Sequence, residues 1–335
     1  MTTILYTESV FTDEAFERDL FGSGVEIVRR NVGRLADLED DVCARTEGLM
    51  LFRHFLSAAD LARFPKLRVV VRMGVGYDRI DRAEAARLGV TVCNCPDYGT
   101  TEVADHAVAL MMALRRAVLL HHEAQRRAPE PAPWTPIDDP LVRRLSSLTV
   151  GIVGLGRIGT AAALRFKAFG CKVVFFDPAL PNGVELALGL ERASRLTELL
   201  RRSDVLSIHV PLTRETRGMI GADQIALLPR GAVIVNTARG PVLDLDAVEQ
   251  GLRSGQLAGA GLDVLPVEPP VAPLPGLLQA YRARAPWLEG RLVVTPHSAF
   301  ASPEAHEDIK RKSAETMRAV LLDHTPQNVI PPQAE

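Results

Sequence analysis

Short apolar runs alternate with helix-like segments along almost the whole chain, in two successive sets. In the first set, the strand-like runs cover residues 4–6, 25–28, 48–52, 69–72 and 90–94. In the second set, they cover residues 148–153, 172–176, 205–209, 232–236, 259–264 and 292–295. Apolar runs of this length with helices between them are typical of parallel strands that are buried on both faces. The pattern therefore predicts an α/β fold with two doubly wound parallel sheets.

Two helical segments stand outside this alternation. Residues 102–127 read as one long helix with apolar side chains on more than one side, and a proline-rich stretch, residues 129–136, follows it. A helix that is apolar on several sides needs burial on each of them, and a stiff proline-rich segment extends as an arm. We therefore expect a subunit interface here. The last helix, at about 303–322, could return to the first domain.

Composition narrows the kinds of partner. The chain has 335 residues, is 47% hydrophobic and has a formal net charge of −2, so it lacks the basic excess that binds nucleic acid or a membrane surface. It has no signal-peptide pattern and no apolar run near the roughly 20 residues of a membrane span. These features predict a cytoplasmic protein with a small-molecule partner.

The four cysteines are too scattered to suggest a disulfide framework. Cys93 and Cys95 are separated by one residue, whereas the cysteine pairs of zinc and redox sites usually have two between them. We therefore expect reduced thiols, at least two of them in buried strands, and no metal site.

A glycine-rich turn begins where the first strand of the second set ends. It reads Gly154-Leu155-Gly156-Arg157-Ile158-Gly159 and precedes a helix predicted over residues 160–169. The first glycine permits a tight turn, the second lets a pyrophosphate approach the backbone, and the third lets helix and strand pack closely. The turn is therefore predicted to bind the phosphates of a dinucleotide at the N-terminus of the helix.

An acidic residue follows the next strand. Asp177 comes eighteen residues after Gly159, where a carboxylate can bind both hydroxyls of the adenosine ribose and would repel a 2′-phosphate. The sequence therefore predicts NAD rather than NADP as the cofactor. Taken alone, the same residues would also suit an ordinary glycine turn and an Asp helix cap.

Three polar residues, Arg239, Glu268 and His297, each follow a strand-like run or the loop after it. In open α/β sheets, ligands bind at the carboxyl ends of the strands. A guanidinium can bind a carboxylate through two hydrogen bonds, and a carboxylate beside an imidazole favours the protonated form that a general acid needs. Together the three predict reduction of a 2-oxo acid, although Arg239 alone could form a surface ion pair and His297 alone could be a buried structural histidine.

The chain resembles the D-isomer-specific 2-hydroxyacid dehydrogenases in a series of motifs that occur in the same order. They lie at residues 72–78, 154–159, 209–213, 236–240, 261–264 and 295–297. Within that family the chain looks closest to the branch of the C-terminal binding proteins, which are NAD(H)-sensing corepressors that retain a dehydrogenase site. The segments that resemble this branch are 51–54, 71–74, 167–170, 176–178 and 183–190.

The resemblance implies two Rossmann-like or flavodoxin-like βα domains. Residues 1–100 and 301–335 would form a discontinuous substrate-binding domain, and residues 101–300 an NAD-binding domain in which 101–147 are the dimerisation helix and arm. Arg239 would anchor the substrate, and His297 would donate a proton with Glu268 as its partner. Further cofactor contacts are implied for His209, Pro211, Thr237, Ala238 and Asp263. Substrate contacts are implied for Arg72, Val75 and Gly76, with His54 near the mouth of the crevice and Phe300 as an apolar wall.

Two features depart from the corepressor branch. That branch has a tryptophan where this chain has Phe300. The stretch between Glu268 and His297 is also longer here and includes residues 280–287, which we expect to form a surface or active-site-rim insertion. We interpret the chain as an NAD-dependent D-2-hydroxyacid dehydrogenase that reduces small 2-oxo acids with short polar or anionic tails. The alternative is an NAD(H)-sensing binding protein of the corepressor type, which would keep the same residues. The other histidines, including His121, His122, His306 and His324, are expected to be solvated.

Overall fold

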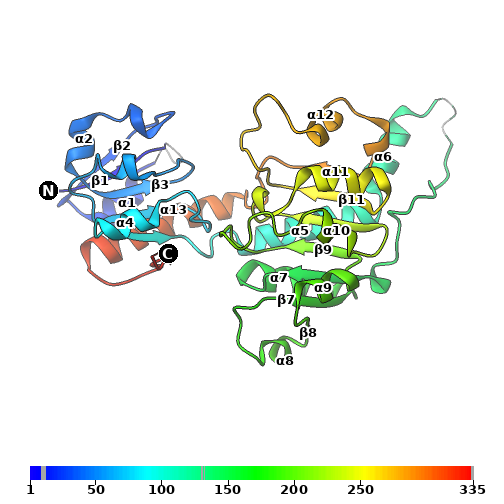
Figure 1. Ribbon diagram of the computed structural model, residues 1–335. Coiled ribbons are helices and arrows are strands. Elements are labelled where there is room, and N and C mark those ends of the chain that lie inside the picture. Colours follow the sequence, from blue (N-terminus) through cyan, green and yellow to red (C-terminus); the bar gives the residue numbers. More distant parts are fainter. Residues whose placement is uncertain (9–12, 130, 132, 333–335) are drawn as a thin grey trace. The chain divides into compact units, whose positions relative to one another are not determined.

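The structure is a computed structural model that describes residues 1–8, 13–129, 131 and 133–332, so Glu130 and Ala132 of the proline-rich stretch lie outside it. The chain divides into two compact units (Figure 1). The first comprises Met1–Tyr98 and Ser302–Glu335, and the second comprises Gly99–Ala301. Because both chain ends belong to the first unit, the chain passes from one unit to the other twice.

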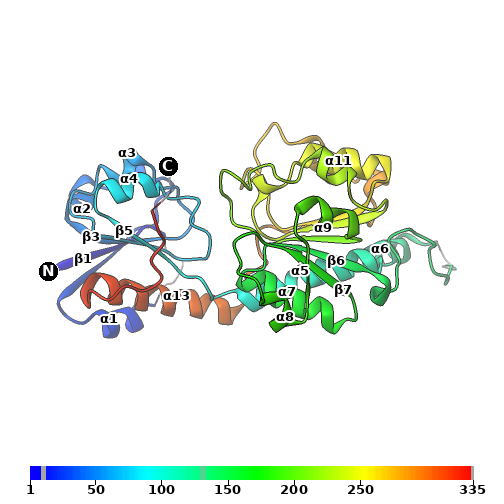
Figure 2. The same cartoon turned by 60° about the horizontal axis from the view of Figure 1, so that its bottom comes forward.

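The first unit is built on a parallel sheet, which has five strands within the described residues, in the order β2-β1-β3-β4-β5. Its strands are β1 (Thr2–Tyr6), β2 (Val25–Arg29), β3 (Thr46–Leu51), β4 (Val69–Arg72) and β5 (Thr91–Asn94). Its helices are α1 (Ala15–Phe21), α2 (Asp40–Arg45), α3 (Ala58–Leu61), α4 (Arg82–Arg87) and α13 (Pro303–Met317), with short helical turns at Leu35–Asp37 and Arg318–Leu322. Figure 2 shows α1 and α13 on one face of the sheet and α2, α3 and α4 on the other. Burial on both faces explains the unbroken apolar runs.

The second unit has a longer parallel sheet, with seven strands within the described residues, in the order β12-β11-β10-β9-β6-β7-β8. Its strands are β6 (Thr149–Val153), β7 (Lys172–Phe176), β8 (Glu191–Arg192), β9 (Val205–Ile208), β10 (Ala232–Asn236), β11 (Leu257–Leu262) and β12 (Leu292–Val294). Its longer helices are α5 (Thr100–Arg115), α6 (Val118–Arg127), α7 (Arg157–Ala168), α8 (Val184–Leu188), α9 (Leu196–Arg202), α10 (Ala222–Ala226), α11 (Leu245–Ser254) and α12 (Gly276–Arg282). Short 3₁₀ turns lie at Leu145–Ser147, Gly240–Val242 and Pro286–Leu288.

Helices cover both faces of this second sheet. Figure 2 shows α9 and α11 on one face and α5 and α7 on the other. Two separate apolar clusters fill these layers, one including Leu199, Val248 and Leu252 and the other including Leu110, Met111 and Phe166. The predicted α/β fold with two parallel sheets is therefore confirmed. The short strand β8 was not predicted.

The prediction of one long helix over residues 102–127 is wrong. The helix breaks between α5 and α6, where Ala117 takes a left-handed conformation with φ 48°. Just before the break, the buried guanidinium of Arg115 donates from Nη2 to the carbonyl oxygens of Asp204 (2.5 Å) and Gly231 (3.0 Å). Burial lowers the pKa of Arg115 to about 10. The break contains neither glycine nor proline, so the local sequence does not indicate it.

A buried ion network ties α1 to the rest of the first unit. Glu17 on α1 is fully buried, and its Oε1 lies 2.9 Å from Nη2 of Arg29 at the end of β2. Its Oε2 lies 3.7 Å from Nζ of Lys310 on α13, which is also buried. A buried carboxylate needs such partners, because an unpaired charge there would cost several kcal/mol. The network joins a segment from the start of the chain to one from its end.

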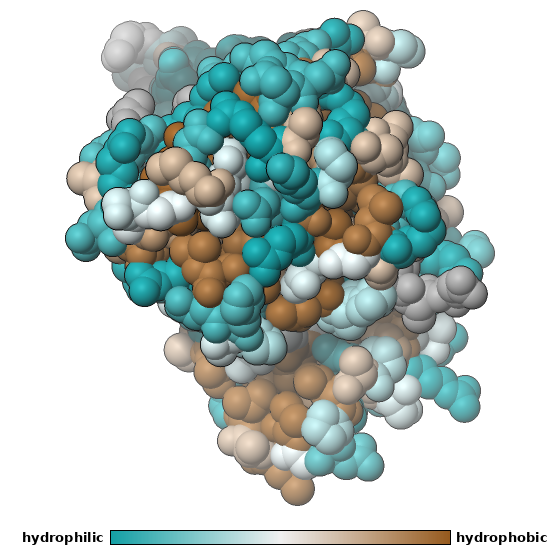
Figure 3. Space-filling view, turned by 90° about the vertical axis from the view of Figure 1, so that its left-hand side faces the viewer, coloured by the Kyte–Doolittle hydropathy of each residue, from teal (hydrophilic) through white to brown (hydrophobic). Residues whose placement is uncertain are grey.

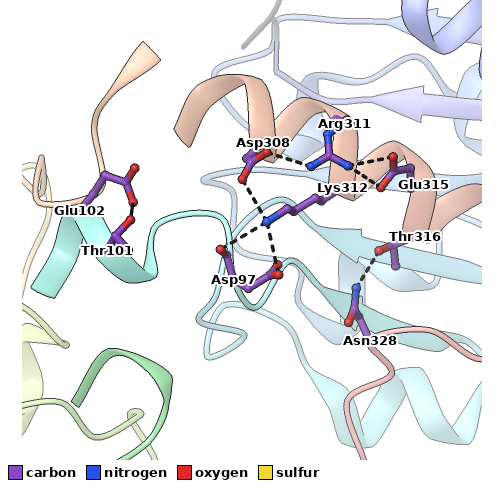
Figure 4. A network of polar contacts seen from close by, with 9 residues as sticks. All are labelled: Asp97, Thr101, Glu102, Asp308, Arg311, Lys312, Glu315, Thr316 and Asn328. Carbon is purple, nitrogen blue, oxygen red and sulfur yellow. Dashed lines mark hydrogen bonds and ion pairs between the residues drawn. The ribbon is translucent and has the colours of Figure 1, made fainter. Parts of the chain in front are cut away.

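A second network, drawn in Figure 4, joins α13 to the segment that follows β5. Nζ of Lys312 lies 3.3 Å from Oδ2 of Asp97 and 3.0 Å from Oδ2 of Asp308. Arg311 donates to Asp308 and to Glu315 on the same helix. These contacts hold α13 within the first unit. Figure 3 is viewed from the left-hand side of Figure 1. The surface on this side is mostly hydrophilic and carries several separate apolar areas.

Between Glu268 and His297, the stretch of residues 280–287 lies at the surface of the second unit, as expected. Residues 281–284 are exposed, and none of residues 280–287 is buried. The segment is anchored in the core by Leu277, Leu278 and Leu288, which are buried on α12 and in the turn at Pro286–Leu288. The guanidinium of Arg291 then donates to four carbonyl oxygens, those of Leu252, Leu257, Ala258 and Trp287.

Several smaller expectations can be compared with the structure. His122 and His324 are exposed, but His121 is not simply solvated: its Nδ1 donates to the carbonyl oxygen of Ala117 (2.8 Å) and its Nε2 accepts from the backbone N–H of Ile137 (3.1 Å). His306 also bonds, through Nδ1, to the carbonyl oxygen of Ser302 (2.7 Å). All four cysteines are free and buried, but only Cys93 lies within a strand.

In the described part of the chain, no helix is both long and apolar enough to cross a membrane. The same residues contain no cluster of three or more His, Cys, Asp or Glu side chains that could hold a metal ion.

Candidate active site

The predicted site residues of the second unit lie along one edge of its sheet. Each follows the carboxyl end of a strand, and because the strands are parallel these ends share an edge. In sheet order, Asp177 follows β7, the glycine turn follows β6 and His209 follows β9. On the other side, Thr237 and Arg239 follow β10, Asp263 and Glu268 follow β11, and His297 follows β12. The edge thus runs from the proposed ribose-binding carboxylate to the proposed catalytic residues.

The glycine turn has the form that phosphate binding requires. Gly159 sits in the first turn of α7, where an added Cβ would lie 2.0 Å from the carbonyl oxygen of Gly154. Any side chain there would push the helix away from the turn. At Gly156, by contrast, an added Cβ would meet nothing within 4 Å, so a ligand can approach the backbone closely. The N-terminus of α7 begins at the next residue, Arg157, whose side chain is exposed.

Two enclosed polar atoms beside this turn fit a dinucleotide. Among the described residues, Nδ1 of His209 and Oγ1 of Thr237 are buried side-chain atoms without a hydrogen-bond partner. Buried polar atoms are normally paired, so these two indicate a ligand that supplies the missing partners. Nε2 of His209 lies 2.8 Å from the hydroxyl of Ser207, and burial lowers the pKa of His209 to about 4, so its ring is neutral at physiological pH. Together with the open space at Gly156, these atoms are those expected of an NAD site.

The remaining predicted cofactor residues are ordered by their own neighbours. Oδ2 of Asp177 accepts the backbone N–H of Leu155 in the glycine turn (2.9 Å). The backbone N–H of Ala238 donates to the side chain of Asn236 (3.0 Å), and the carbonyl oxygen of Pro211 accepts from Thr216 (2.6 Å). Ile158 is half-buried within α7.

The structure brings Glu268 and His297 together. Nδ1 of His297 lies 2.7 Å from Oε2 of Glu268, and both side chains are partly exposed. The other oxygen of Glu268, Oε1, accepts the backbone N–H of Leu265 (2.8 Å), which fixes the carboxylate in place. With Nδ1 directed at Glu268, Nε2 is the nitrogen of His297 that can exchange a proton with a ligand.

The backbone at His297 is strained and held from one side by Asp263. His297 has φ 52°, in the left-handed region that costs a non-glycine residue about 1–3 kcal/mol. Its N–H donates to the carbonyl oxygen of Asp263 (2.8 Å). The buried Asp263 carboxylate accepts from the hydroxyl of Thr295 (2.6 Å) and from the backbone N–H groups of Ser298 (2.9 Å) and Ala299 (3.0 Å). Asp263 thus shapes the turn that presents His297, a task the sequence did not reveal.

Sequence reasoning also missed His106. Its Nε2 lies 3.0 Å from the hydroxyl of Thr295 and 3.7 Å from Oδ1 of Asp263. Because the Thr295 hydroxyl donates its hydrogen to Asp263, it must accept from Nε2–H of His106. In the sequence, His106 is one of several polar residues on α5, and nothing there identifies its partner.

Arg239 is placed by a close approach of two loops. An added Cβ at its neighbour Gly240 would lie 1.9 Å from the carbonyl carbon of Leu265, so only glycine lets the loop after β10 pack against the loop after β11. The latter loop carries Glu268. The guanidinium of Arg239 donates from Nη1 to the carbonyl oxygen of Ala238 (2.8 Å). The half-buried Arg239 therefore shares its sheet edge with the pair of Glu268 and His297.

Phe300 lies beside the same pair. Its ring meets that of His297 edge to face, with the ring centres 6.3 Å apart and an angle of 80° between the planes. Phe300 also packs against Gly99, where an added Cβ would lie 3.2 Å from its Cβ. The turn after β12 therefore positions an aromatic side chain next to the imidazole.

The predicted substrate residues of the first unit lie at the carboxyl edge of its own sheet. Arg72 ends β4 and is 9% exposed, with Nη1 donating to the carbonyl oxygen of Met73 (3.1 Å) and the guanidinium 5.9 Å from the ring of Phe52. His54 follows β3, and its Nδ1 lies 3.5 Å from Oε1 of Glu8. Val75 and Gly76 follow β4, and the carbonyl oxygen of Val75 accepts from Asn94 (2.7 Å).

Comparison with known proteins shows a matching protein family and several similar proteins. Residues 108–299 match the model of a protein family described as "D-isomer specific 2-hydroxyacid dehydrogenase, NAD binding domain". A glyoxylate reductase of Korarchaeum cryptofilum is 40% identical over 266 residues, which cover 79% of this chain and 76% of that protein. A D-3-phosphoglycerate dehydrogenase of Methanocaldococcus jannaschii is 34% identical over 293 residues, which cover 87% of this chain and 51% of that longer protein.

Solved structures agree in fold. The crystal structure of D-lactate dehydrogenase from Aquifex aeolicus with NAD and lactic acid has a TM-score of 0.83 and 26% identity, covering 98% of this chain and 99% of that one. An NADPH-dependent glyoxylate/hydroxypyruvate reductase from Sinorhizobium meliloti, with NADP and malonate, has a TM-score of 0.79 and 27% identity, covering 99% of this chain and 97% of that one.

Proposed function

Because the chain belongs to the family of D-isomer specific 2-hydroxyacid dehydrogenases, we propose that it reduces a short 2-oxo acid with NADH and that His297 supplies the proton. The protein is an NAD-dependent oxidoreductase that acts on the CH–OH group of its donor. The observation that carries the proposal is the 2.7 Å contact between His297 and Glu268.

Bound NADH supplies the hydride that reduces the C2 carbonyl. The guanidinium of Arg239 binds the substrate carboxylate and polarises the neighbouring carbonyl group. As negative charge develops on the carbonyl oxygen, Nε2 of His297 donates a proton to it, and the Glu268 carboxylate balances the charge of the imidazolium beforehand. His209 and Thr237 would hold the cofactor through the polar atoms that have no hydrogen-bond partner among the described residues, and Asp177 would hold the adenosine ribose.

The proposed substrate is an acid of glyoxylate or hydroxypyruvate size. Two of the compared proteins are a glyoxylate reductase and a glyoxylate/hydroxypyruvate reductase, which supports a short substrate. The contacts of Val75, Gly76, Arg72 and His54 with substrate stay predictions. The edge-to-face contact between the rings of His297 and Phe300 supports an aromatic wall beside the bound substrate.

The test is an NADH-oxidation screen across 2-oxo acids of increasing length, with NADPH in parallel. We expect glyoxylate and hydroxypyruvate to give the highest kcat/KM, and glycolate and D-glycerate to reduce NAD in the reverse direction. A protein that binds NADH tightly but turns over none of these acids would favour the alternative of an NAD(H)-sensing protein of the corepressor type. Preference for the L-hydroxy acids would contradict the proposal directly.

We also propose a homodimer formed through residues 101–147. None of the residues of α6 is buried, and Val118 and Trp134, 54% and 87% exposed, place apolar surface on this segment. Exposed apolar side chains gathered on one segment commonly mark a subunit interface. Light scattering coupled to size-exclusion chromatography should give twice the monomer mass, and Trp134→Glu should shift the protein towards the monomer. The cytoplasmic location stays a prediction.

A further inference from the structure

The loop that follows β7 carries Asp177 and is held by one side chain from the next strand. Arg192 on β8 donates from Nη1 to the carbonyl oxygens of Asp177 (3.4 Å) and Leu180 (3.2 Å), and from Nη2 to that of Pro181 (2.7 Å). We infer that Arg192 is a positioning residue that sets the selectivity for NAD over NADP. This inference rests on the proposed role of Asp177 as the ribose-binding carboxylate.

The guanidinium is fixed on its remaining sides. Its Nε lies 2.9 Å from Oε2 of Glu185 on α8, and its plane lies over Phe175, with Cζ 5.0 Å from the ring centre. Oε1 of Glu185 in turn accepts the backbone N–H of Gly183 (3.2 Å) at the end of the loop. Arg192 and Glu185 are 19% and 24% exposed at the side chain. Both ends of the loop, Asp177 and Gly183, are thus tied to the same ion pair.

The position of the Asp177 carboxylate follows from the shape of this loop. Oδ1 accepts the N–H of Ala179 within the loop (2.9 Å), and Oδ2 accepts the N–H of Leu155 in the glycine turn (2.9 Å). Three loop carbonyl oxygens converge on Arg192, and only a planar guanidinium can satisfy them and Glu185 together. Without it, these carbonyls turn to water and the loop loses the shape that directs the carboxylate.

The charges of the ion pair matter as much as its shape. Glu185 balances the positive charge of Arg192, and the N–H groups of the guanidinium that form these bonds point at the loop backbone, so they do not attract a 2′-phosphate. The carboxylate of Asp177 then discriminates by binding the ribose hydroxyls of NADH and repelling the phosphate of NADPH. The reductase from Sinorhizobium meliloti, with a similar fold, uses NADPH, so the fold itself does not decide the choice.

The decisive variant is Arg192→Lys, which keeps the positive charge beside Glu185 but cannot reach all the carbonyl oxygens. Dissociation constants for NADH and NADPH are measured by cofactor fluorescence and by calorimetry, without substrate. The NADH constant should rise about tenfold, as expected for losing one hydrogen bond to a charged group. The NADPH constant should change by less than about twofold, because the repulsion weakens as the carboxylate moves away. The dissociation constant for NADPH divided by that for NADH should therefore fall about tenfold.

Arg202→Lys is the matched control. Arg202 pairs with Glu191 on β8 and Glu198 on α9, but donates to no carbonyl oxygen of the Asp177 loop in the described structure. Its replacement should leave the ratio as in the wild type. Because a ratio of two constants does not depend on the fraction of folded protein, a destabilised variant still reports on selectivity. Arg192→Gln provides a second measurement if Arg192→Lys does not fold.

Asp177→Ala separates this inference from the proposed role of Asp177. If the wild type binds NADH and NADPH equally, or Asp177→Ala leaves their ratio unchanged, the role of Asp177 is refuted and the inference with it. If Asp177→Ala narrows the ratio but Arg192→Lys and Arg192→Gln do not, only the inference is overturned. The expected result is that both single variants narrow the ratio and the Asp177→Ala, Arg192→Lys double variant narrows it no further, because Arg192 acts through Asp177.

Discussion

Nδ1 of His297 lies 2.7 Å from Oε2 of Glu268, although 29 residues separate them in the chain. The intervening segment folds into α12 and the turn at Pro286–Leu288, packs against the core, and returns along β12 to place the imidazole beside the carboxylate. The other carboxylate oxygen of Glu268 accepts a hydrogen bond from the backbone N–H of Leu265, which holds the carboxylate in place. Glu268 therefore orients the imidazole of His297 so that its Nε2 is directed away from the carboxylate.

This contact predicts that the two side chains act together in the catalytic step. His297→Asn removes the proton donor, so kcat should fall about 10²-fold or more. Glu268→Gln removes the negative charge that balances the imidazolium, so kcat should also fall, while NADH affinity stays unchanged. Steady-state kinetics of both single variants and of the double variant check this, and losses that simply add in the double variant would show that the two residues do not act as a pair.

The proposed contact between Arg239 and the substrate carboxylate predicts the kinetics of an Arg239 variant. Arg239→Lys keeps the charge but loses the two-pronged contact with the substrate carboxylate, so KM should rise and kcat should fall. The combined loss should be about 3 kcal/mol in transition-state binding, typical of a disrupted charge pair at a buried site. NADH affinity should stay within about twofold of the wild type, since the variant leaves the glycine turn untouched. Steady-state kinetics and cofactor titration measure both, and full turnover in the variant would refute the assignment.

His106 provides a test of the turn that presents His297. His106→Leu removes the donor to Thr295, so we expect kcat to fall about five- to tenfold, equivalent to a lost hydrogen bond of about 1 kcal/mol, with KM little changed. His106→Gln keeps an N–H donor and should restore most of the loss. Steady-state kinetics of both variants decide between positioning and simple packing. Equal losses in the two variants would mean that the side chain only fills space.

The neutral imidazole of His209 predicts a pH-dependent stability. Burial lowers its pKa from 6.5 to about 4. Between these values the unfolded chain takes up a proton that the folded chain excludes, so the free energy of unfolding falls as the pH drops from 6.5 towards 4. The fall from this residue alone is at most about 1.4 kcal/mol for each pH unit.

Urea unfolding at several pH values checks this, with His209→Asn as the comparison. Other groups titrate in the same range in both proteins, so the difference between the two slopes isolates His209. We expect the variant to lose less stability than the wild type over this range. Parallel curves would show that His209 is protonated in the folded protein.

Phe300 predicts which substrate tail is preferred. Its ring lies edge to face against His297 and offers less apolar contact surface than the tryptophan of the corepressor branch, so an apolar tail gains less from it. We expect the wild type to reduce hydroxypyruvate with a higher kcat/KM than a methylthio-oxobutyrate, and Phe300→Trp to reverse or narrow this preference. Measuring kcat/KM for both acids in both proteins tests the idea. A wild type that already prefers the thioether would show that Phe300 does not form the substrate wall.

The sequence by itself determined the elements that depend on local rules. The apolar runs predicted the strands of both sheets except the short edge strand β8, because a strand buried on both faces has few polar positions to interrupt it. The glycine turn and Asp177 follow from backbone geometry over a few residues, so their spacing was enough to indicate an NAD site. Arg239, Glu268 and His297 were recognisable because each directly follows a strand, or the loop after it, on a parallel sheet.

Only the tertiary structure decided the features that join distant segments. Just before the break between α5 and α6, Arg115 bonds to the carbonyl oxygens of Asp204 and Gly231, and no local pattern encodes these contacts. Asp263 can hold the His297 turn, and His106 can donate to Thr295, only because the ends of β11 and β12 and the helix α5 meet in one place. The same holds for Arg192, whose partners lie in a neighbouring loop and on α8. Hydrogen bonds between side chains and distant backbone leave no periodic trace in a sequence, so they appear only once the chain is folded.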